Sequence, residues 1–173
     1  MSTSQVRRRQ ATVIGDSDAP PEMCSVAEQI GEMLAGLGII VITGGRGGVM
    51  EAACRGAVKA GGATVGILPS SEMNDANPWC SVVIPTGLGH ARNVVNVLAG
   101  DFVIALGGSA GTLSEVCFAW IHGKPILTVK GCDAWLGKIG TELDDRGTSS
   151  IKVCEDLESL KEAVMLSVTN MSG

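Results

Sequence analysis

The segment IALGGSAGTLSEVCFAW, from Ile104 to Trp120, indicates the fold more clearly than any other part of the sequence. An apolar strand leads into a glycine-rich turn, and the pattern predicts a helix that follows at once and carries the carboxylate of Glu115 in its first turn. Glycine lets a backbone approach another group closely, and the start of a helix presents free N–H groups and a partial positive charge. Such a turn is typical of a site for an anion, most often a phosphate. A tight turn that only packs a helix against its sheet has the same pattern.

On both sides of this segment, short apolar stretches alternate with longer helical ones. We expect strands over residues 11–15, 39–43, 63–69, 80–85, 101–106, 125–129 and 151–153. Besides the helix that ends at His122, we expect helices over residues 24–38, 49–61, 90–100 and 156–168. The longest polar loop is expected over residues 71–79, and no element is assigned to residues 131–149.

The predicted strands show no alternation of apolar and polar residues, which is typical of strands that are covered on both faces. With helices between them, they predict an α/β fold, namely a three-layer, Rossmann-like, doubly wound parallel sheet with helices on both faces. No repeat or linker divides the sequence, so we expect a single domain over residues 1–173, with residues 1–10 as a flexible tail.

The composition argues against several classes of function. Hydrophobic residues make up 45% of the 173 residues and charged residues 18%, which favours a large interior over disorder. The net charge is −5, the only basic run is Arg7–Arg9, and aromatic residues make up 3%, so we expect no nucleic-acid partner. The basic run is interpreted as part of a solvated tail. No apolar stretch reaches the roughly 20 residues that a membrane helix needs, and no signal peptide is recognisable, so we expect a cytoplasmic protein without a membrane partner.

Cysteine and histidine do not suggest a metal site. The six cysteines are scattered without a C-x-x-C pair, and several lie in apolar segments where a reduced cysteine acts as a small hydrophobic residue. His90 and His122 are the only histidines, so a zinc site would need distant residues to converge. We therefore expect no metal.

Three turns at predicted strand ends are chemically unusual: GDSD (Gly15–Asp18), TGGRGGVM (Thr43–Met50) and GGSAGT (Gly107–Thr112). In a doubly wound sheet, ligands bind beyond the carboxyl ends of the strands, near the point where the strand order reverses. Two glycine loops in one sheet therefore favour a phosphate-bearing ligand. The dinucleotide motif G-x-G-x-x-G is missing after the first strand and no G-x-x-x-x-G-K-[ST] motif is present, which argues against a nicotinamide enzyme and a nucleoside triphosphatase.

The segments GGRGGVMEAACRGA, TGLGHARN and GGSAGTLSE resemble the LONELY GUY (LOG) family, historically misnamed lysine decarboxylases. That resemblance covers about residues 11–166 and implies a phosphoribohydrolase that releases the base from a nucleoside 5′-monophosphate. The sequence departs from the family pattern at Gly107 (Pro in the family), Ser109 (Gly) and Asn93 (Lys). TGLGHARN is closer to a neighbouring branch, the molybdenum-cofactor carrier proteins, which bind the cofactor rather than hydrolyse a nucleotide.

The sequence thus leaves three functions open. The first is a phosphoribohydrolase that yields ribose 5-phosphate and a free base, and the alternative is a non-catalytic carrier of molybdenum cofactor, a pterin phosphate. The third is a regulatory nucleotide sensor. None of these requires a resident cofactor, and the bound ligand would be a nucleoside monophosphate or molybdenum cofactor.

Glu115 and Arg92 are the candidate catalytic residues, because a carboxylate can stabilise the charge that develops on ribose and a guanidinium can grip phosphate or ribose oxygens. Glu115 has the alternative role of favouring a helix dipole, and Arg92 that of a surface arginine. Arg46 is a second phosphate candidate, and Met50 is expected to line the pocket. The full set of candidate ligand-binding residues is Gly15, Ser17, Thr43, Gly44, Gly45, Arg46, Gly47, Gly48, Met50, Asn93, Gly107, Gly108, Ser109, Ala110, Gly111 and Thr112.

Two of the predicted helices are apolar on nearly every face, namely in EVCFAWI (Glu115–Ile121) and NVVNVLAG (Asn93–Gly100). A helix that covers one face of a sheet should have a polar outer side. We therefore expect these helices to pack against a second subunit, which gives at least a homodimer. Burial beneath other elements of the same chain is the alternative.

Overall fold

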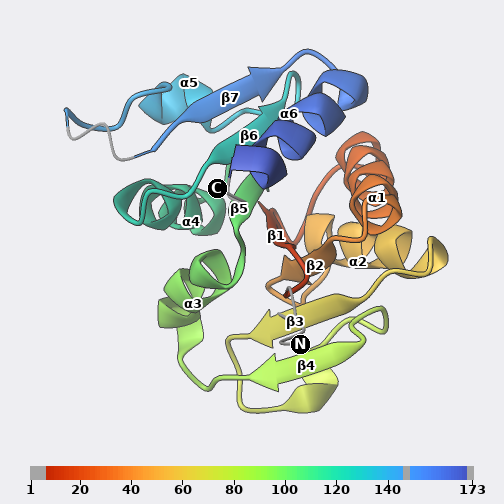
Figure 1. Ribbon diagram of the computed structural model, residues 1–173. Coiled ribbons are helices and arrows are strands. Elements are labelled where there is room, and N and C mark those ends of the chain that lie inside the picture. Colours follow the sequence, from red (N-terminus) through yellow and green to blue (C-terminus); the bar gives the residue numbers. More distant parts are fainter. Residues whose placement is uncertain (1–6, 146–148, 171–173) are drawn as a thin grey trace, which may run out of the picture.

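The computed structural model describes residues 7–145 and 149–170, which contain a seven-stranded parallel sheet (Figure 1). The strand order is β4-β3-β2-β1-β5-β6-β7, and all neighbouring strands are parallel. The strands are β1 (Gln10–Gly15), β2 (Ile40–Thr43), β3 (Thr64–Leu68), β4 (Val82–Pro85), β5 (Phe102–Leu106), β6 (Ile126–Val129) and β7 (Ile151–Cys154). The order reverses between β1 and β5, which is the point where a doubly wound sheet opens a crevice for a ligand.

Helices cover both faces of the sheet (Figure 1). One face carries α1 (Pro21–Gly36), α2 (Val49–Lys59) and α6 (Leu157–Asn170), and the other carries α3 (Arg92–Ala99), α4 (Ala110–Ile121) and the short α5 (Leu136–Ile139). Two single 3₁₀ turns, η1 (Met73–Asp75) and η2 (Gly89–Ala91), lie in the connections on either side of β4. The three-layer arrangement confirms the predicted fold class.

Strand β5 explains why the sheet needs two covering layers. All five of its residues are buried, and they alternate between two hydrophobic cores because successive side chains of a strand point to opposite faces. Phe102, Ile104 and Leu106 belong to the core beneath α1, α2 and α6. Val103 and Ala105 belong to the core beneath α3 and α4. An apolar strand without polar alternation is therefore the expected sequence for this position.

Helices α1 and α2 are joined by an ion-pair network in addition to their apolar contacts. The carboxylate of Glu28 accepts hydrogen bonds from Arg55 (2.9 Å) and Lys59 (2.7 Å). These bonds lower the pKa of Glu28 to about 2. The two helices are thus held together by charged side chains as well as by apolar contacts.

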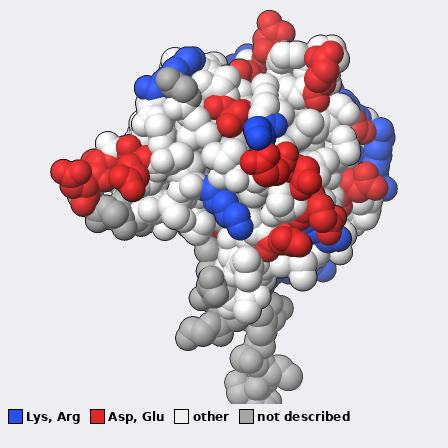
Figure 2. Space-filling model, turned by 90° about the horizontal axis from the view of Figure 1, so that it is seen from above, with Lys and Arg blue, Asp and Glu red and all other residues white. Residues whose placement is uncertain are grey.

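The structure corrects the interpretation of the N-terminal basic run. Residues 1–6 of the predicted tail lie outside the described residues, but Gln10 is the first residue of β1. The guanidinium of Arg7 donates to both carboxylate oxygens of Asp101, so this arginine is paired rather than only solvated. On the face seen in Figure 2, acidic side chains are widely spread and the described lysines and arginines are scattered among them.

Two further findings concern the chain as a whole. Residues 131–149, to which the sequence assigned no element, contain the one-turn helix α5, while residues 146–148 lie outside the described part. Within the described residues, no helix has both the length and the apolar character that crossing a membrane requires.

Candidate functional site

A cleft of about 490 Å³ opens at the carboxyl ends of β1, β2, β3 and β5, beside the reversal of strand order. The predicted residues that line this cleft are Gly15, Ser17, Arg46, Met50, Arg92, Asn93, Ser109, Gly111, Thr112 and Glu115. They come from four separate segments of the chain, which the parallel sheet brings to one edge because all of its strands end on the same side. Both candidate catalytic residues therefore face the same cavity.

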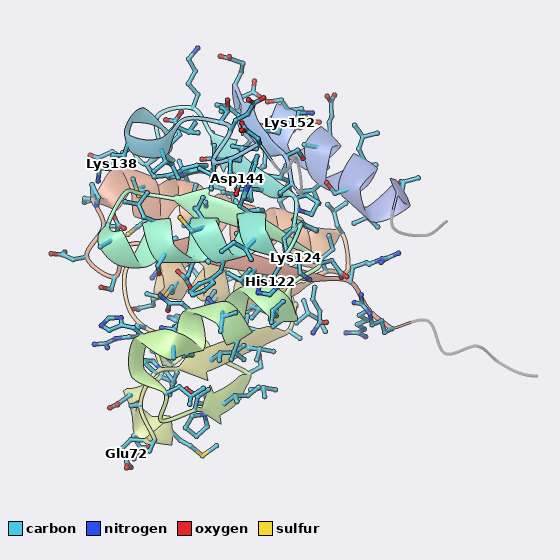
Figure 3. The ribbon with its side chains drawn as sticks, turned by 90° about the vertical axis from the view of Figure 1, so that its left-hand side faces the viewer. Glu72, His122, Lys124, Lys138, Asp144 and Lys152 are labelled. Carbon is cyan, nitrogen blue, oxygen red and sulfur yellow. The ribbon has the colours of Figure 1, made fainter. Side chains whose placement is uncertain are left out.

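Arg92 and Glu115 form a buried pair at one wall of the cleft. Arg92 begins α3, and its Nη1 lies 3.7 Å from Oε1 of Glu115 on α4. Each residue is only 7% exposed. The amide of Asn96, one turn after Arg92, donates a 2.7 Å hydrogen bond to the same carboxylate oxygen. The neighbouring helices α3 and α4 (Figure 3) thus hold the pair in place from both sides.

The position of Glu115 differs from the prediction in one respect. Ser109 caps α4 by accepting a hydrogen bond from the N–H of Thr112, so Glu115 lies in the second turn and not in the first. A favourable interaction with the N-terminus of the helix dipole is therefore not its main role, since that effect fades beyond the first turn. Burial raises the pKa of Glu115 to about 7, although the hydrogen bond from Asn96 and the charge of Arg92 act in the opposite direction. Near neutral pH this side chain can therefore both give and accept a proton.

Arg92 retains unused hydrogen-bonding capacity. Burial lowers its pKa, while Glu115 acts against this shift and the charge of Arg46 adds to it. Among the residues that the structure describes, its buried Nε has no hydrogen-bond partner, and neither has the buried Oγ of Ser70, which lines the same cleft. Buried polar atoms without partners are costly, so these two groups indicate a ligand or water molecules in the cleft.

Gly44 makes room for the guanidinium of Arg92. A Cβ atom at Gly44 would lie 2.3 Å from Nη1 of Arg92 and 2.7 Å from Sδ of Met50. The sequence suggested that this glycine allows a ligand to approach the backbone. In the structure it allows a cationic side chain of the same chain to reach the cleft.

The glycine loop that precedes α2 leaves its backbone donors open. The N–H groups of Arg46, Gly47 and Gly48 have no hydrogen-bond partner among the described residues, and no side chain caps the start of α2. Asn77 fixes the loop from outside, because its N–H donates to the carbonyl oxygen of Gly45 (2.8 Å) and its amide to that of Arg46 (3.0 Å). This loop therefore combines free N–H groups, a helix N-terminus and the exposed cation of Arg46.

The loop that precedes α4 is filled by a side chain that the sequence did not single out. The carboxylate of Asp16 accepts hydrogen bonds from the N–H groups of Gly108 (3.1 Å) and Ser109 (3.0 Å) and from Oγ1 of Thr112 (2.8 Å). Burial alone would raise the pKa of Asp16, but these hydrogen bonds outweigh it and lower the pKa. The N–H groups of Gly108 and Ser109, which we predicted to be free, are thus occupied.

The other predicted ligand residues lie beside the cleft without lining it: Thr43, Gly44, Gly45, Gly47, Gly48, Gly107, Gly108 and Ala110. Several have a packing role. A Cβ atom at Gly48, which has φ of +61°, would lie 2.3 Å from the carbonyl oxygen of Asp16, and one at Gly45 would lie 2.8 Å from Leu68. Oγ1 of the buried Thr43 accepts the N–H of Gly45 (3.1 Å) and so shapes the turn.

The sequence analysis missed four residues that line the cleft: Pro69, Ser70, Gly89 and His90. The first two directly follow β3, so the rule that ligands bind at the carboxyl ends of strands could have found them. His90 lies in TGLGHARN, the segment that supplied Arg92. Asn96 was also missed, although its spacing of four from Arg92 places both on one face of a helix.

Of the cysteines and histidines in the described part of the chain, only His90 lines this cleft. All six cysteines are free thiols. No cluster of three or more histidine, cysteine, aspartate or glutamate side chains suited to a metal ion occurs in the described ranges. The polar side chains of the cleft include those of Arg46, Ser70, His90, Arg92, Asn93 and Glu115, with Asn96 bonded to Glu115.

Comparison with known proteins agrees with this architecture. Residues 8–163 match the family described as SLOG cluster4. The molybdenum cofactor binding protein of the phototrophic bacterium Rippkaea orientalis superposes with a TM-score of 0.86 and 36% identity over 95% of this chain and 99% of that one. The molybdenum cofactor carrier protein of Chlamydomonas reinhardtii superposes with a TM-score of 0.84 and 32% identity over 94% and 99%. The cytokinin riboside 5′-monophosphate phosphoribohydrolase of Mycobacterium tuberculosis is 32% identical over 132 residues, which cover 66% of this chain and 70% of the relative.

Proposed function

The chain belongs to the SLOG cluster4 family, and we propose that it binds molybdenum cofactor, a phosphorylated pterin, in the cleft beside β1 and β5 and acts as its carrier. The family match confirms the predicted resemblance to the LOG-like proteins near the molybdenum-cofactor carrier branch. The ligand is cargo in this proposal, so no resident cofactor is involved. A cytoplasmic location stays a prediction.

The observation that carries the proposal is the unused polar capacity of the cleft wall. Within residues 7–145 and 149–170, the buried Nε of Arg92 and the buried hydroxyl of Ser70 have no hydrogen-bond partner. A phosphate monoester would supply acceptor oxygens for Arg92 and for the N–H groups of the Arg46–Gly48 loop. A pterin ring presents both donors and acceptors, which suit Asn93 and a Glu115 that titrates near neutrality.

The two solved molybdenum-cofactor proteins support this choice over the alternatives. Each is covered over 99% of its length, and their identities of 36% and 32% extend over nearly the whole of this chain. Two proteins named for this cofactor thus superpose on this chain over nearly its whole length, which supports a similar cargo.

A phosphoribohydrolase remains a second candidate, and one observation favours it. Glu115 has a pKa near 7 and lies beside Arg92, so its protonated form could donate to a departing base while its ionised form could stabilise the positive charge on ribose. Cleavage would break the N-glycosidic bond, add the hydroxyl of water to the sugar carbon and leave the proton on the base. The phosphoribohydrolase relative, at 32% identity, is consistent with this chemistry.

Two measurements separate these functions. The first is mass spectrometry of small molecules that co-purify with the protein expressed in cells able to make the cofactor, where we expect a pterin phosphate. The second is chromatography of adenine, guanine, cytosine and uracil nucleoside monophosphates incubated with equimolar protein, where we expect no free base and no ribose 5-phosphate above background.

Substitution Glu115→Gln sharpens the second measurement. If base release occurs, the variant should lose about a hundredfold or more in turnover while nucleotide affinity changes little, because the interaction would strengthen in the transition state. Base release that depends on Glu115 in this way would replace the carrier proposal by the hydrolase. Base release that the variant retains in full would point to a contaminating enzyme.

A further inference from the structure

Asp16 occupies the place where an anion would bind at the start of α4. Its carboxylate lies between the N–H groups of Gly108 and Ser109 and the hydroxyl of Thr112, at 2.8–3.1 Å from each donor atom. Two backbone N–H groups and a hydroxyl at a helix N-terminus are the donors that a phosphate oxygen would use. These donors are already satisfied by an anion of the chain itself.

Gly107 is fitted to Asp16. Its φ is +99°, a region that favours glycine, and a Cβ atom there would lie 2.6 Å from Oδ2 of Asp16. The missing side chain therefore makes room for the aspartate. A phosphate brought to the same donors would have to displace Asp16 or lie against its negative charge, and like charges at contact distance repel strongly away from bulk water.

The start of α2 is different, because the loop before it lies beside the same cleft with open donors, although the N–H of Val49 donates to the carbonyl oxygen of Asp16 (3.0 Å). The N–H groups of Gly47 and Gly48 have no partner among the described residues, and Arg46 lies in the same loop. Arg92 is 7% exposed and lines the cleft, and its Nε has no partner in the described part of the chain. Glu51, in the first turn of α2, has Oε1 3.8 Å from Nη1 of Arg55, and its Oε2 would lie 4.0 Å from a Cβ atom at Gly47.

We propose that Asp16 is an internal anion that closes the start of α4 to phosphate, so that the phosphate of a bound ligand lies at the start of α2, between the Arg46–Gly48 loop and Arg92. The second half of this inference rests on the proposed function, because it concerns a phosphorylated ligand. The first half concerns the protein alone. Asp16 thus selects between two glycine loops that look equivalent in sequence.

Titration of ¹⁵N-labelled protein with inorganic phosphate, followed by amide chemical shifts, tests the inference. In the wild type, the amides of Gly47 and Gly48 should shift with increasing phosphate while those of Gly108 and Ser109 stay in place. Equal shifts at both loops, or shifts at Gly108 and Ser109 alone, would overturn the assignment, and so would the absence of shifts at the highest concentration tested.

The substitution Asp16→Ser provides the second arm, with Asp18→Asn as its matched control. Asp18 is an exposed acid in the same turn and accepts no hydrogen bond among the described residues. Loss of the Asp16 charge should add phosphate-dependent shifts at Gly108 and Ser109, with affinity at that loop at least tenfold above the wild type, whereas Asp18→Asn should behave as the wild type. Thermal melting checks that each variant is folded; if Asp16→Ser does not fold, the wild-type titration alone decides.

These outcomes are separable from those of the cofactor experiments. If no pterin phosphate is bound but inorganic phosphate shifts Gly47 and Gly48, the subsite stands and the identity of the ligand is wrong. If the cofactor binds but phosphate shifts Gly108 and Ser109 in the wild type, the subsite is wrong and the carrier function stands.

Discussion

The two glycine loops of the cleft have similar sequences, but they differ in whether their backbone N–H groups already have hydrogen-bond partners. The loop before α2 (Gly44–Gly48) leaves three N–H groups without a partner and carries a cation, whereas the loop before α4 (Gly107–Thr112) has its donors satisfied by the carboxylate of Asp16. The difference comes from a residue that belongs to neither loop. A glycine-rich turn after a strand therefore indicates where a backbone can be approached, but the surrounding side chains determine whether a ligand or the chain itself occupies it.

The helices that follow these loops differ in a related way. Helix α2 packs along α1, and the Glu28 network joins the two helices, so most of α2 is covered within the chain. Helix α4 lies beside α3 on the opposite face (Figure 3), and exposed apolar side chains remain there, with Leu98 47% and Ile121 49% exposed. At the end of α3, Lys124, labelled in Figure 3, donates to the carbonyl oxygen of Gly100 (2.6 Å). The helix after the first loop, α2, is thus largely covered by α1. The helix after the second loop, α4, lies beside α3 with apolar side chains exposed to solvent in the monomer.

The substitution Leu98→Glu should have the largest effect, because it places a charge on the exposed apolar surface of α3 and α4. We expect the wild type to be at least a dimer through α3 and α4, and a two-fold interface would bury the new charge twice. Each of the two substituted side chains should cost about 2 kcal/mol or more of association free energy, which together weakens assembly about a thousandfold. Light scattering at micromolar concentration measures this change. Leu166→Glu on α6, at a residue that is 58% exposed, is the matched control and should leave the assembly intact. A monomeric wild type would contradict the expectation.

The substitution Arg92→Ala should weaken ligand binding by about a hundredfold, because it removes a buried cation with an unused donor from the α2 side of the cleft. Calorimetry with the co-purified pterin phosphate measures the loss, and the same variant should abolish the phosphate-dependent shifts at Gly47 and Gly48. Arg55→Ala is the control. Arg55 lies on α2, the helix that follows the open loop, but its guanidinium pairs with Glu28 of α1 and does not line the cleft. A loss of equal size in both variants would indicate a general effect of charge and contradict a specific site.

Much of the fold could be predicted because its strands are continuous apolar segments. Strand β5 was expected over residues 101–106 and spans Phe102–Leu106, since every one of its side chains is buried. Helix boundaries were less accurate where local chemistry favours an earlier start: α1 begins at Pro21, a residue suited to the first turn, rather than at Cys24. Helix α5 has only four residues, which is too short for a periodic pattern to reveal it.

The sequence was sufficient to predict the two glycine loops and the two residues of the buried pair. Arg92 and Glu115 were found through the resemblance to a known family, and the structure brings them together at 3.7 Å. Asp16 could not be found in this way, because its hydrogen bond to Gly108 joins residues 92 positions apart in the sequence. Whether a loop's donors are free depends on such contacts between distant segments, and no local pattern records them.

The smallest expected effect is that of Gly111→Val, which tests whether the α4 loop acts as a wall of the cleft. Gly111 lines the cleft, and a Cβ atom there would meet only Oγ of Ser109, at 3.8 Å, so the fold should tolerate the change. The branched side chain would take space from the ligand without removing a phosphate donor, and we expect a loss of affinity of about tenfold. Gly36→Val, at the exposed end of α1 where a Cβ atom meets nothing within 4 Å, is the matched control for valine in a helix. If Asp16 closes the α4 loop, Gly111→Val should weaken binding of the pterin phosphate and leave the inorganic phosphate shifts at Gly47 and Gly48 unchanged. A parallel loss of both would mean that phosphate binds at α4, and the two loops would then share the anion that we assign to one.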